Sequence, residues 1–187
     1  GLWKPDSVKV FSNMLESEDT AKATWASNAL RELGSVSGWY HRFPDVVNAE
    51  SLVRLLDRVP HDALYLTKTM VQSDEELAKP RGLAAALARL GIASRLVVLM
   101  DGLDCQALVV QTATYILWSR EYTEDSSLYA FTLKLAHPTM MEKVTEAANS
   151  SRVENGDCIS YFRALHSVVA APRSSRAYID EVSIQDT

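Results

Sequence analysis

The feature that most constrains this chain is a helical pattern that returns four times along it. Apolar residues three and four positions apart mark one face of a helix, and this spacing occurs in segments that begin at residues 23, 62, 107 and 158. The starts are therefore 39, 45 and 51 residues apart. Because spacings of about 40 to 47 residues are typical of stacked helical units, we expect each unit to cover the apolar face of the next.

Glycine and proline, which interrupt helices, are scarce. The 187 residues hold seven Gly and six Pro, and the stretches between them are rich in residues that favour helices over strands. We therefore predict an all-α protein of roughly nine to eleven helices, in a single domain over residues 1–187. The expected helices cover about residues 7–15, 23–33, 48–59, 61–72, 73–77, 82–91, 92–103, 105–119, 128–137, 139–149 and 158–169.

Two local details complete this prediction. Ser73 or Asp74 is expected to cap the short helix at 73–77, because both residue types are favoured at helix N-termini. One face of the last strong helix is expected to lie in the core, since its apolar residues are three or four apart. These residues are Cys158, Phe162, Leu165 and Val169.

The charge balance argues against nucleic acid as the main ligand. The chain has 19 Lys and Arg against 24 Asp and Glu, a net charge of -5, whereas phosphate backbones are bound by clustered cations in excess. No apolar run approaches the roughly 18 to 20 residues of a membrane-spanning helix. We expect neither nucleic-acid binding nor membrane insertion.

Cysteine usage and the first residue bear on where the protein works. Cys105 and Cys158 fit no metal knuckle or redox pair and are expected to be small buried hydrophobes, with a disulfide as the less favoured alternative. We therefore expect an intracellular protein, cytoplasmic or nuclear. Because the chain opens on Gly1 without a secretory leader, we expect a fragment of a longer protein.

Two capped apolar helices carry a family resemblance. They are V-V-N-A-E-S-L-V-R-L-L at 46–56 and I-A-S-R-L-V-V-L-M at 92–100. With the fourfold pattern, they make the chain, over about residues 5–182, resemble the armadillo and HEAT group of helical repeats. The resemblance implies a right-handed superhelix of about four irregular repeats. It also implies a groove that binds extended peptides or partner helices.

Trp25 and Asn28 lie off the apolar side of the segment at 23–33. Importin-like members of the family carry a Trp, and an Asn one turn later, on a groove helix where the amide holds a peptide backbone. By resemblance, Trp25 and Asn28 are candidates for partner binding, although they are three rather than four residues apart and the other segments carry no such pair. Packing between repeats is the alternative role.

Aromatic and basic residues supply the other candidates for partner contact. Trp39 and Tyr40 belong to an aromatic cluster, and Trp118 is a further candidate, because Trp, Tyr and Arg dominate binding hot spots. Arg54, Arg58 and Arg95 give the middle of the chain a basic bias.

These three arginines could grip the carboxylates of an acidic peptide. Alternatively, they are solvated and pair with Asp57 and Asp62.

No catalytic or cofactor motif stands out. The four histidines and two cysteines fit no nucleophile motif, and metal-binding and phosphate-binding signatures are absent from the sequence. We therefore predict a protein-binding module or scaffold without enzymatic activity, cofactor or metal. The alternatives are a structural subunit of a larger viral or organellar assembly and, less favoured, an all-helical enzyme that joins His61 or His166 to carboxylates.

Overall fold

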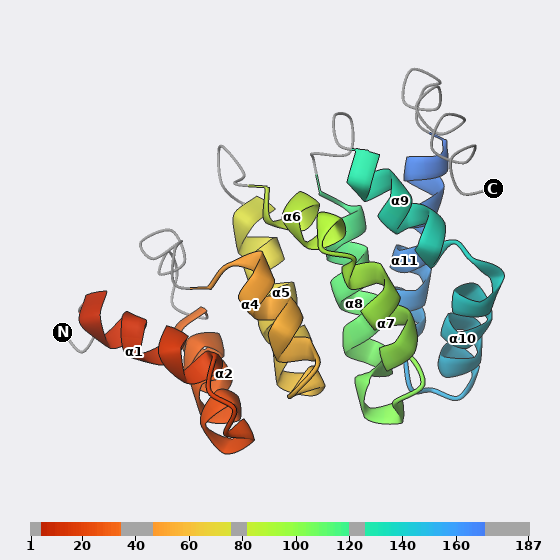
Figure 1. Ribbon diagram of the computed structural model, residues 1–187. Helices are drawn as coiled ribbons and strands as arrows, with labels where there is room; N and C mark the ends of the chain where they lie inside the picture. The colour runs from red at the N-terminus through yellow and green to blue at the C-terminus, as the bar shows by residue number, and fades with distance from the viewer. Residues whose placement is uncertain (1–4, 35–46, 76–81, 120–125, 171–187) are drawn as a thin grey trace, which may run out of the picture.

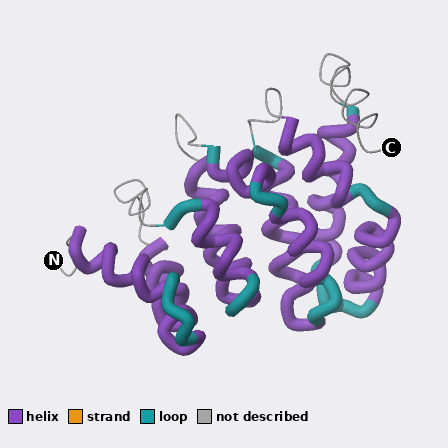
Figure 2. The backbone as a smooth tube through the Cα atoms, in the orientation of Figure 1, coloured by secondary structure: helices purple, strands orange, loops and turns teal. Residues whose placement is uncertain are grey.

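The computed structural model describes residues 5–34, 47–75, 82–119 and 126–170. These residues form ten α-helices, one 3₁₀ turn and no strand (Figure 2), which confirms the all-α prediction. The elements are α1 (Pro5–Leu15), α2 (Thr20–Gly34), α4 (Ala49–Leu56), α5 (Pro60–Glu75), α6 (Leu83–Arg89), α7 (Ile92–Leu99), η1 (Leu103–Cys105), α8 (Gln106–Leu117), α9 (Ser126–Leu135), α10 (Pro138–Asn149) and α11 (Asn155–Val169).

The helices run from α1 and α2 at one end of the molecule through α4 and α5 to α9, α10 and α11 at the other (Figure 1). Four of them form a row, in which α2 packs on α5, α5 on α8, and α8 on α11. These are the four segments whose pattern recurs in the sequence. The remaining helices lie against the row and one another: α1 packs on α2, α4 on α5, and α6 and α7 on α9.

Local signals explain where several helices begin. The side chain of Asn48 accepts a 2.8 Å hydrogen bond from the Ser51 amide and so caps α4, as Asn commonly does. Pro60 is the first residue of α5, where its missing N–H costs nothing. Gly91 has φ +73° between α6 and α7, and glycine adopts this left-handed conformation without a steric penalty.

Several side-chain hydrogen bonds outside the row join residues at similar separations along the chain. Among them are Glu16–Arg54 and Asp57–Arg95, both 38 residues apart, Ser94–Lys134, 40 apart, and Asp101–Lys143, 42 apart. Segments about 40 residues apart in the sequence therefore meet at several places in the fold.

The most apolar helix, α8, lies between α5 and α11 and buries residues on most of its circumference. Thr112 Oγ1 donates to the Leu64 carbonyl of α5 at 3.2 Å. Among the described helices, none alone has the length and hydropathy to cross a membrane; α7 and the segment Leu103–Leu117 pass that test together, with a bend of 120° between them.

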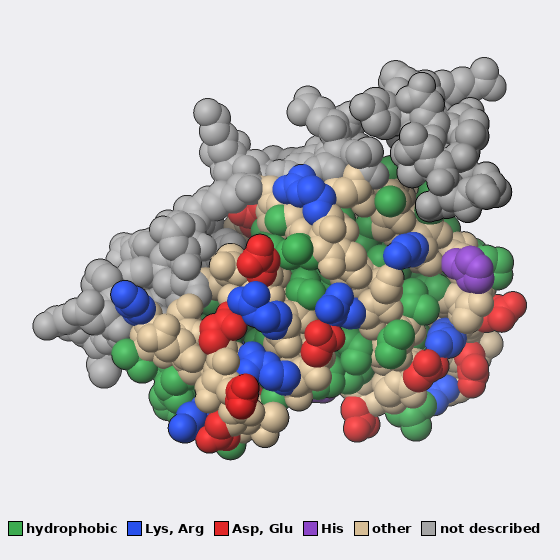
Figure 3. All heavy atoms as spheres, viewed as in Figure 1, with side chains coloured by type: hydrophobic (Ala, Val, Ile, Leu, Met, Phe, Trp, Pro, Cys, Tyr) green, Lys and Arg blue, Asp and Glu red, His purple; other side chains and the backbone are tan. Residues whose placement is uncertain are grey.

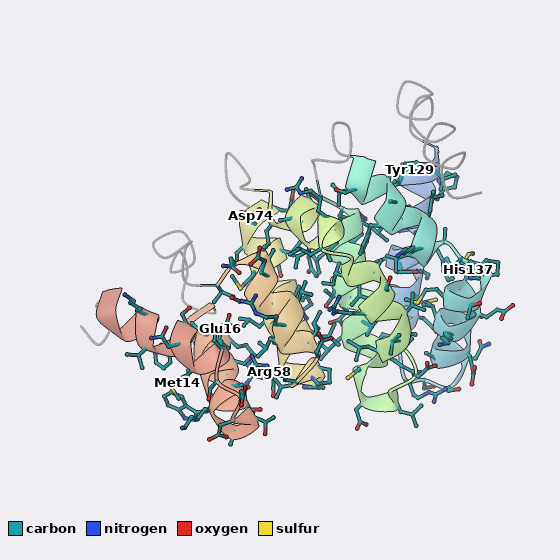
Figure 4. The ribbon with its side chains drawn as sticks, in the orientation of Figure 1. Met14, Glu16, Arg58, Asp74, Tyr129 and His137 are labelled. Carbon is teal, nitrogen blue, oxygen red and sulfur yellow. The ribbon has the colours of Figure 1, made fainter. Side chains whose placement is uncertain are left out.

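The prediction that a separate helix begins at Ser73 or Asp74 is wrong. The helix α5 continues through Ser73 and Asp74 to Glu75, so neither residue caps a new helix. Instead the buried Asp74 Oδ2 accepts a 3.1 Å hydrogen bond from the amide of Leu83, the first residue of α6 (Figure 4). Asp74 thus accepts a hydrogen bond from the first residue of a helix that begins nine residues further along the chain.

The buried face of α11 also differs from the expected one. Its buried residues are Tyr161, Ala164, Leu165 and Val168, whereas Cys158 and Phe162 are half-buried and Val169 is exposed. Tyr161 is fully buried, and its hydroxyl donates to the Leu135 carbonyl of α9 at 2.9 Å. The side of α11 that carries Tyr161 therefore faces the core. Cys105 and Cys158 are free thiols, and Cys105 is buried as predicted.

Candidate partner-binding surface

A line of polar and aromatic side chains crosses the row of helices α2, α5, α8 and α11. We call it the row face and define it by Arg31, Tyr65, Lys68, Gln111 and Asp157. The guanidinium of Arg31 lies 5.0 Å from the centroid of the Tyr65 ring, and the ammonium of Lys68 lies 4.8 Å from it. Cations within about 6 Å of an aromatic centroid are attracted to the ring, so Tyr65 links α2 to α5.

The same line continues through the amide of Gln111 on α8. Lys68 Nζ donates to Gln111 Oε1 at 2.9 Å, and Gln111 Nε2 donates to Asp157 Oδ2 at 2.7 Å. Partial burial lowers the pKa of Lys68, and the negative charge of Asp157 acts against that shift. The line thus joins all four row helices through side chains that remain partly accessible to solvent.

Two aromatic side chains extend the row face along α8. Tyr115 and Trp118 follow Gln111 at helical spacings of four and three, which places them on the same side of the helix. Their rings pack edge to face with centroids 6.2 Å apart. Trp118 is 51% exposed, so a large aromatic surface is open to a partner beside the Gln111 amide.

Of the candidates on α2, Asn28 lies one turn before Arg31, whereas Trp25 lies a further turn back and faces α1. Asn28 is half-buried and precedes Arg31 by three residues, and Trp25 precedes Asn28 by the same interval. Trp25 is 56% exposed, and its ring lies 5.5 Å from that of Phe11. Trp25 is therefore partly exposed and packs within the α1–α2 pair, and its role in partner binding stays a prediction. Trp39 and Tyr40 lie outside the described residues.

The three candidate arginines lie outside the row, Arg54 on α4, Arg58 in the turn after α4 and Arg95 on α7, and each already has a partner within the chain. Arg54 holds Glu16 with two hydrogen bonds, of 2.9 and 3.2 Å, and hydrogen bonding to Arg54 lowers the pKa of Glu16. Arg95 likewise donates two hydrogen bonds to the Asp57 carboxylate, of 3.0 and 3.2 Å. This is the pairing with Asp57 that the sequence left as an alternative, and Figure 3 shows Lys and Arg alternating with Asp and Glu over this face.

Arg58 has a different role from the other two arginines. Its guanidinium donates to the carbonyls of Leu15 and Ser17, at the end of α1, where helix carbonyls lack partners within the helix. Figure 4 shows Arg58 near Glu16, where α4 faces α1 and α2. The structure does not bring the arginines together with Trp25 and Asn28 in one cluster, and their role in partner binding stays a prediction.

The histidines of the described chain form no recognisable catalytic arrangement. His61 lies 4.0 Å from Asp62 at the surface, and His166 is exposed on α11. In the described ranges no group of three or more His, Cys, Asp or Glu side chains could hold a metal ion.

Sequence reasoning missed the residues that define the row face. Their signal was weak but present, because Lys68 and Gln111 are polar residues inside the recurring segments at 62 and 107. A polar residue at such a position needs a partner when neighbouring units close over it. The chain matches no protein-family model, no curated protein and no solved structure.

Proposed function

We propose that this chain is a non-catalytic protein-binding module, built as a right-handed superhelix of irregular armadillo- or HEAT-like repeats. Its units would be α1–α2, α4–α5, α6–α8 and α9–α11, each ending in a helix of the row. The inter-unit ties at separations near 40 residues support this division. In a stack of this kind the aligned helices present one continuous surface.

The observation that carries the proposal is the composition of the row face. It combines amide groups, which can pair with the main chain of a bound segment, with accessible aromatic rings, which contribute large contact areas. On the row face the amide is that of Gln111, and the rings are those of Tyr65, Tyr115 and Trp118; Asn28 and Trp25 on α2 are further candidates. The proposed ligand is an extended segment of another protein that lies across α2, α5 and α8.

The charges beside Tyr65 favour an acidic residue in that segment. Arg31 and Lys68 both approach the ring, and Lys68 loses hydration through partial burial. A partner carboxylate would offset that loss. The alternative surface, at Arg54 and Arg95, would require a partner to displace Glu16 and Asp57.

The test is a selection of peptides from a random library displayed on phage, with the full chain as bait. Binding of the selected peptides is then measured with a Tyr115→Ala plus Trp118→Ala variant and with an Arg54→Met plus Arg95→Met control. We expect at least tenfold weaker binding by the first variant, since hot-spot aromatics each contribute about 2 kcal/mol or more. The control should bind as the unchanged chain does.

Three results would count against the proposal. A selection without peptides that depend on Trp118 would remove the row face as the binding surface. Loss of binding in the arginine control alone would move the site to the opposite set of helices. A chain that elutes only as a large assembly in size-exclusion chromatography would favour a structural subunit instead.

A further inference from the structure

An open pocket of about 280 Å³ lies where α7 meets α9 and the start of α10, on helices outside the row. Its lining comes from Ser94, Val97, Lys134, His137 and Met140. Val97 and the fully buried Met140 make the lining partly apolar, while Ser94, Lys134 and His137 are exposed. The pocket therefore offers an apolar surface beside a cation and an imidazole.

Lys134 differs from three other cations that join one helical unit to the next outside the row. In the pairs Arg54–Glu16, Arg95–Asp57 and Lys143–Asp101 the cation meets a carboxylate, while Arg58 meets the backbone carbonyls of Leu15 and Ser17. At the pocket, Lys134 Nζ instead donates to the neutral hydroxyl of Ser94 at 2.8 Å. Within the described ranges its positive charge is not neutralised by a carboxylate, and two further N–H bonds of its ammonium are open to a ligand.

His137 adds a second donor at the same pocket. Its Nδ1 accepts a hydrogen bond of 3.3 Å from the Thr139 amide, so that the imidazole caps α10 (Figure 4). In a neutral ring with an accepting Nδ1, the hydrogen is on Nε2. His137 can therefore cap its helix and still donate to a ligand.

We propose that this pocket binds the carboxyl-terminal residue of another polypeptide whose last side chain is apolar. The carboxylate pairs with Lys134, the side chain packs on Val97 above the buried Met140, and His137 Nε2–H donates to the preceding carbonyl. At about 280 Å³ the pocket is slightly smaller than most ligand sites, which measure about 300 to 1,000 Å³, and this size suits one residue. A chain end joins a carboxylate and an apolar group at one carbon, as the mixed lining requires.

The experiment is a titration of the full chain, labelled with ¹³C at the methionine methyl groups. The chain has five methionines, so Met140 reports on the pocket while the buried Met70 and Met100 report on the rest of the core. The probes are N-acetyl-leucine, N-acetyl-leucinamide and 4-methylpentanoate. N-acetyl-leucine should shift the Met140 methyl signal and bind at least tenfold more tightly than the amide, as expected for a hydrogen bond between charged groups.

Two variants separate the pocket from general charge effects. Lys134→Met should weaken N-acetyl-leucine binding at least tenfold, whereas Lys143→Met, at a lysine of α10 that is paired with Asp101, should leave it unchanged. Equal binding of the acid and the amide, or no shift at Met140, would overturn the proposal. Tighter binding of 4-methylpentanoate than of N-acetyl-leucine would overturn the assignment to a chain end. All of these outcomes are independent of the row face.

Discussion

The amide of Gln111 joins Lys68 to Asp157 across the width of α8, with hydrogen bonds of 2.9 and 2.7 Å. A single side chain thus connects three of the four row helices. Because the amide both accepts and donates, it satisfies a cation on one side and an anion on the other. The row face is therefore part of the structure as well as the proposed binding surface.

Replacing Gln111 by Met keeps the length of the side chain and removes both hydrogen bonds. We expect the free energy of unfolding to fall by about 1 to 3 kcal/mol, because the partly buried Lys68 ammonium loses its acceptor. Urea denaturation followed by circular dichroism measures the change. Asn149→Met, an exposed amide at the end of α10, is the control and should change stability by less than about 0.5 kcal/mol.

Asp74 should be among the most sensitive polar positions of the described chain. Asp74→Ala removes a buried acceptor of the Leu83 amide, so we expect a loss of about 1 to 3 kcal/mol. Hydrogen exchange at Leu83 should accelerate more than exchange within α8. The exposed Glu142→Ala removes the same charge as a control, and equal effects of the two variants would contradict the capping role of Asp74.

The three arginines should differ in their contributions to stability. Arg58→Met leaves the carbonyls of Leu15 and Ser17 without their donor and should cost about 1 to 3 kcal/mol. Arg54→Met breaks an ion pair in which both side chains are largely accessible, so its cost should be below about 1 kcal/mol. Thermal denaturation of both variants gives the order, and a larger loss for Arg54 would contradict these assignments.

Because Tyr161 is buried, we expect the protein to lose stability at alkaline pH. Burial raises the pKa of its hydroxyl well above the ordinary value, whereas the unfolded chain titrates near pH 10. The unfolded state therefore loses its proton first, and the stability from a neutral buried Tyr161 is present below about pH 10 and declines above it.

Tyr161→Phe removes this titration together with the hydrogen bond to Leu135. We expect the variant to be about 1 kcal/mol less stable at pH 7 and to lose less stability between pH 9 and 11 than the unchanged chain. Unfolding free energies measured over this range, with Tyr129→Phe as a control, give the comparison. Parallel pH profiles for the Tyr161 variant and the unchanged chain would contradict this account.

The sequence predicted the helices well where periodic apolar residues meet a clear break, as at Asn48 and Gly91. It failed at Ser73 and Asp74, because a residue that caps a distant helix looks the same in sequence as one that caps the next. It also misplaced the core face of α11, since the sequence does not show that the Tyr161 hydroxyl finds an acceptor inside the fold, the Leu135 carbonyl. The row face escaped prediction because its hydrogen bonds join residues more than 40 positions apart.

The central claim is that the aligned helices of the row form one surface for a partner segment. Hydrogen–deuterium exchange of the full chain, free and bound to a peptide from the selection, tests this most directly. We predict slower exchange in α2, α5 and α8 together, with α4, α7 and α9 unchanged. Protection confined to α4 and α7, or to a single helix of the row, would contradict the claim.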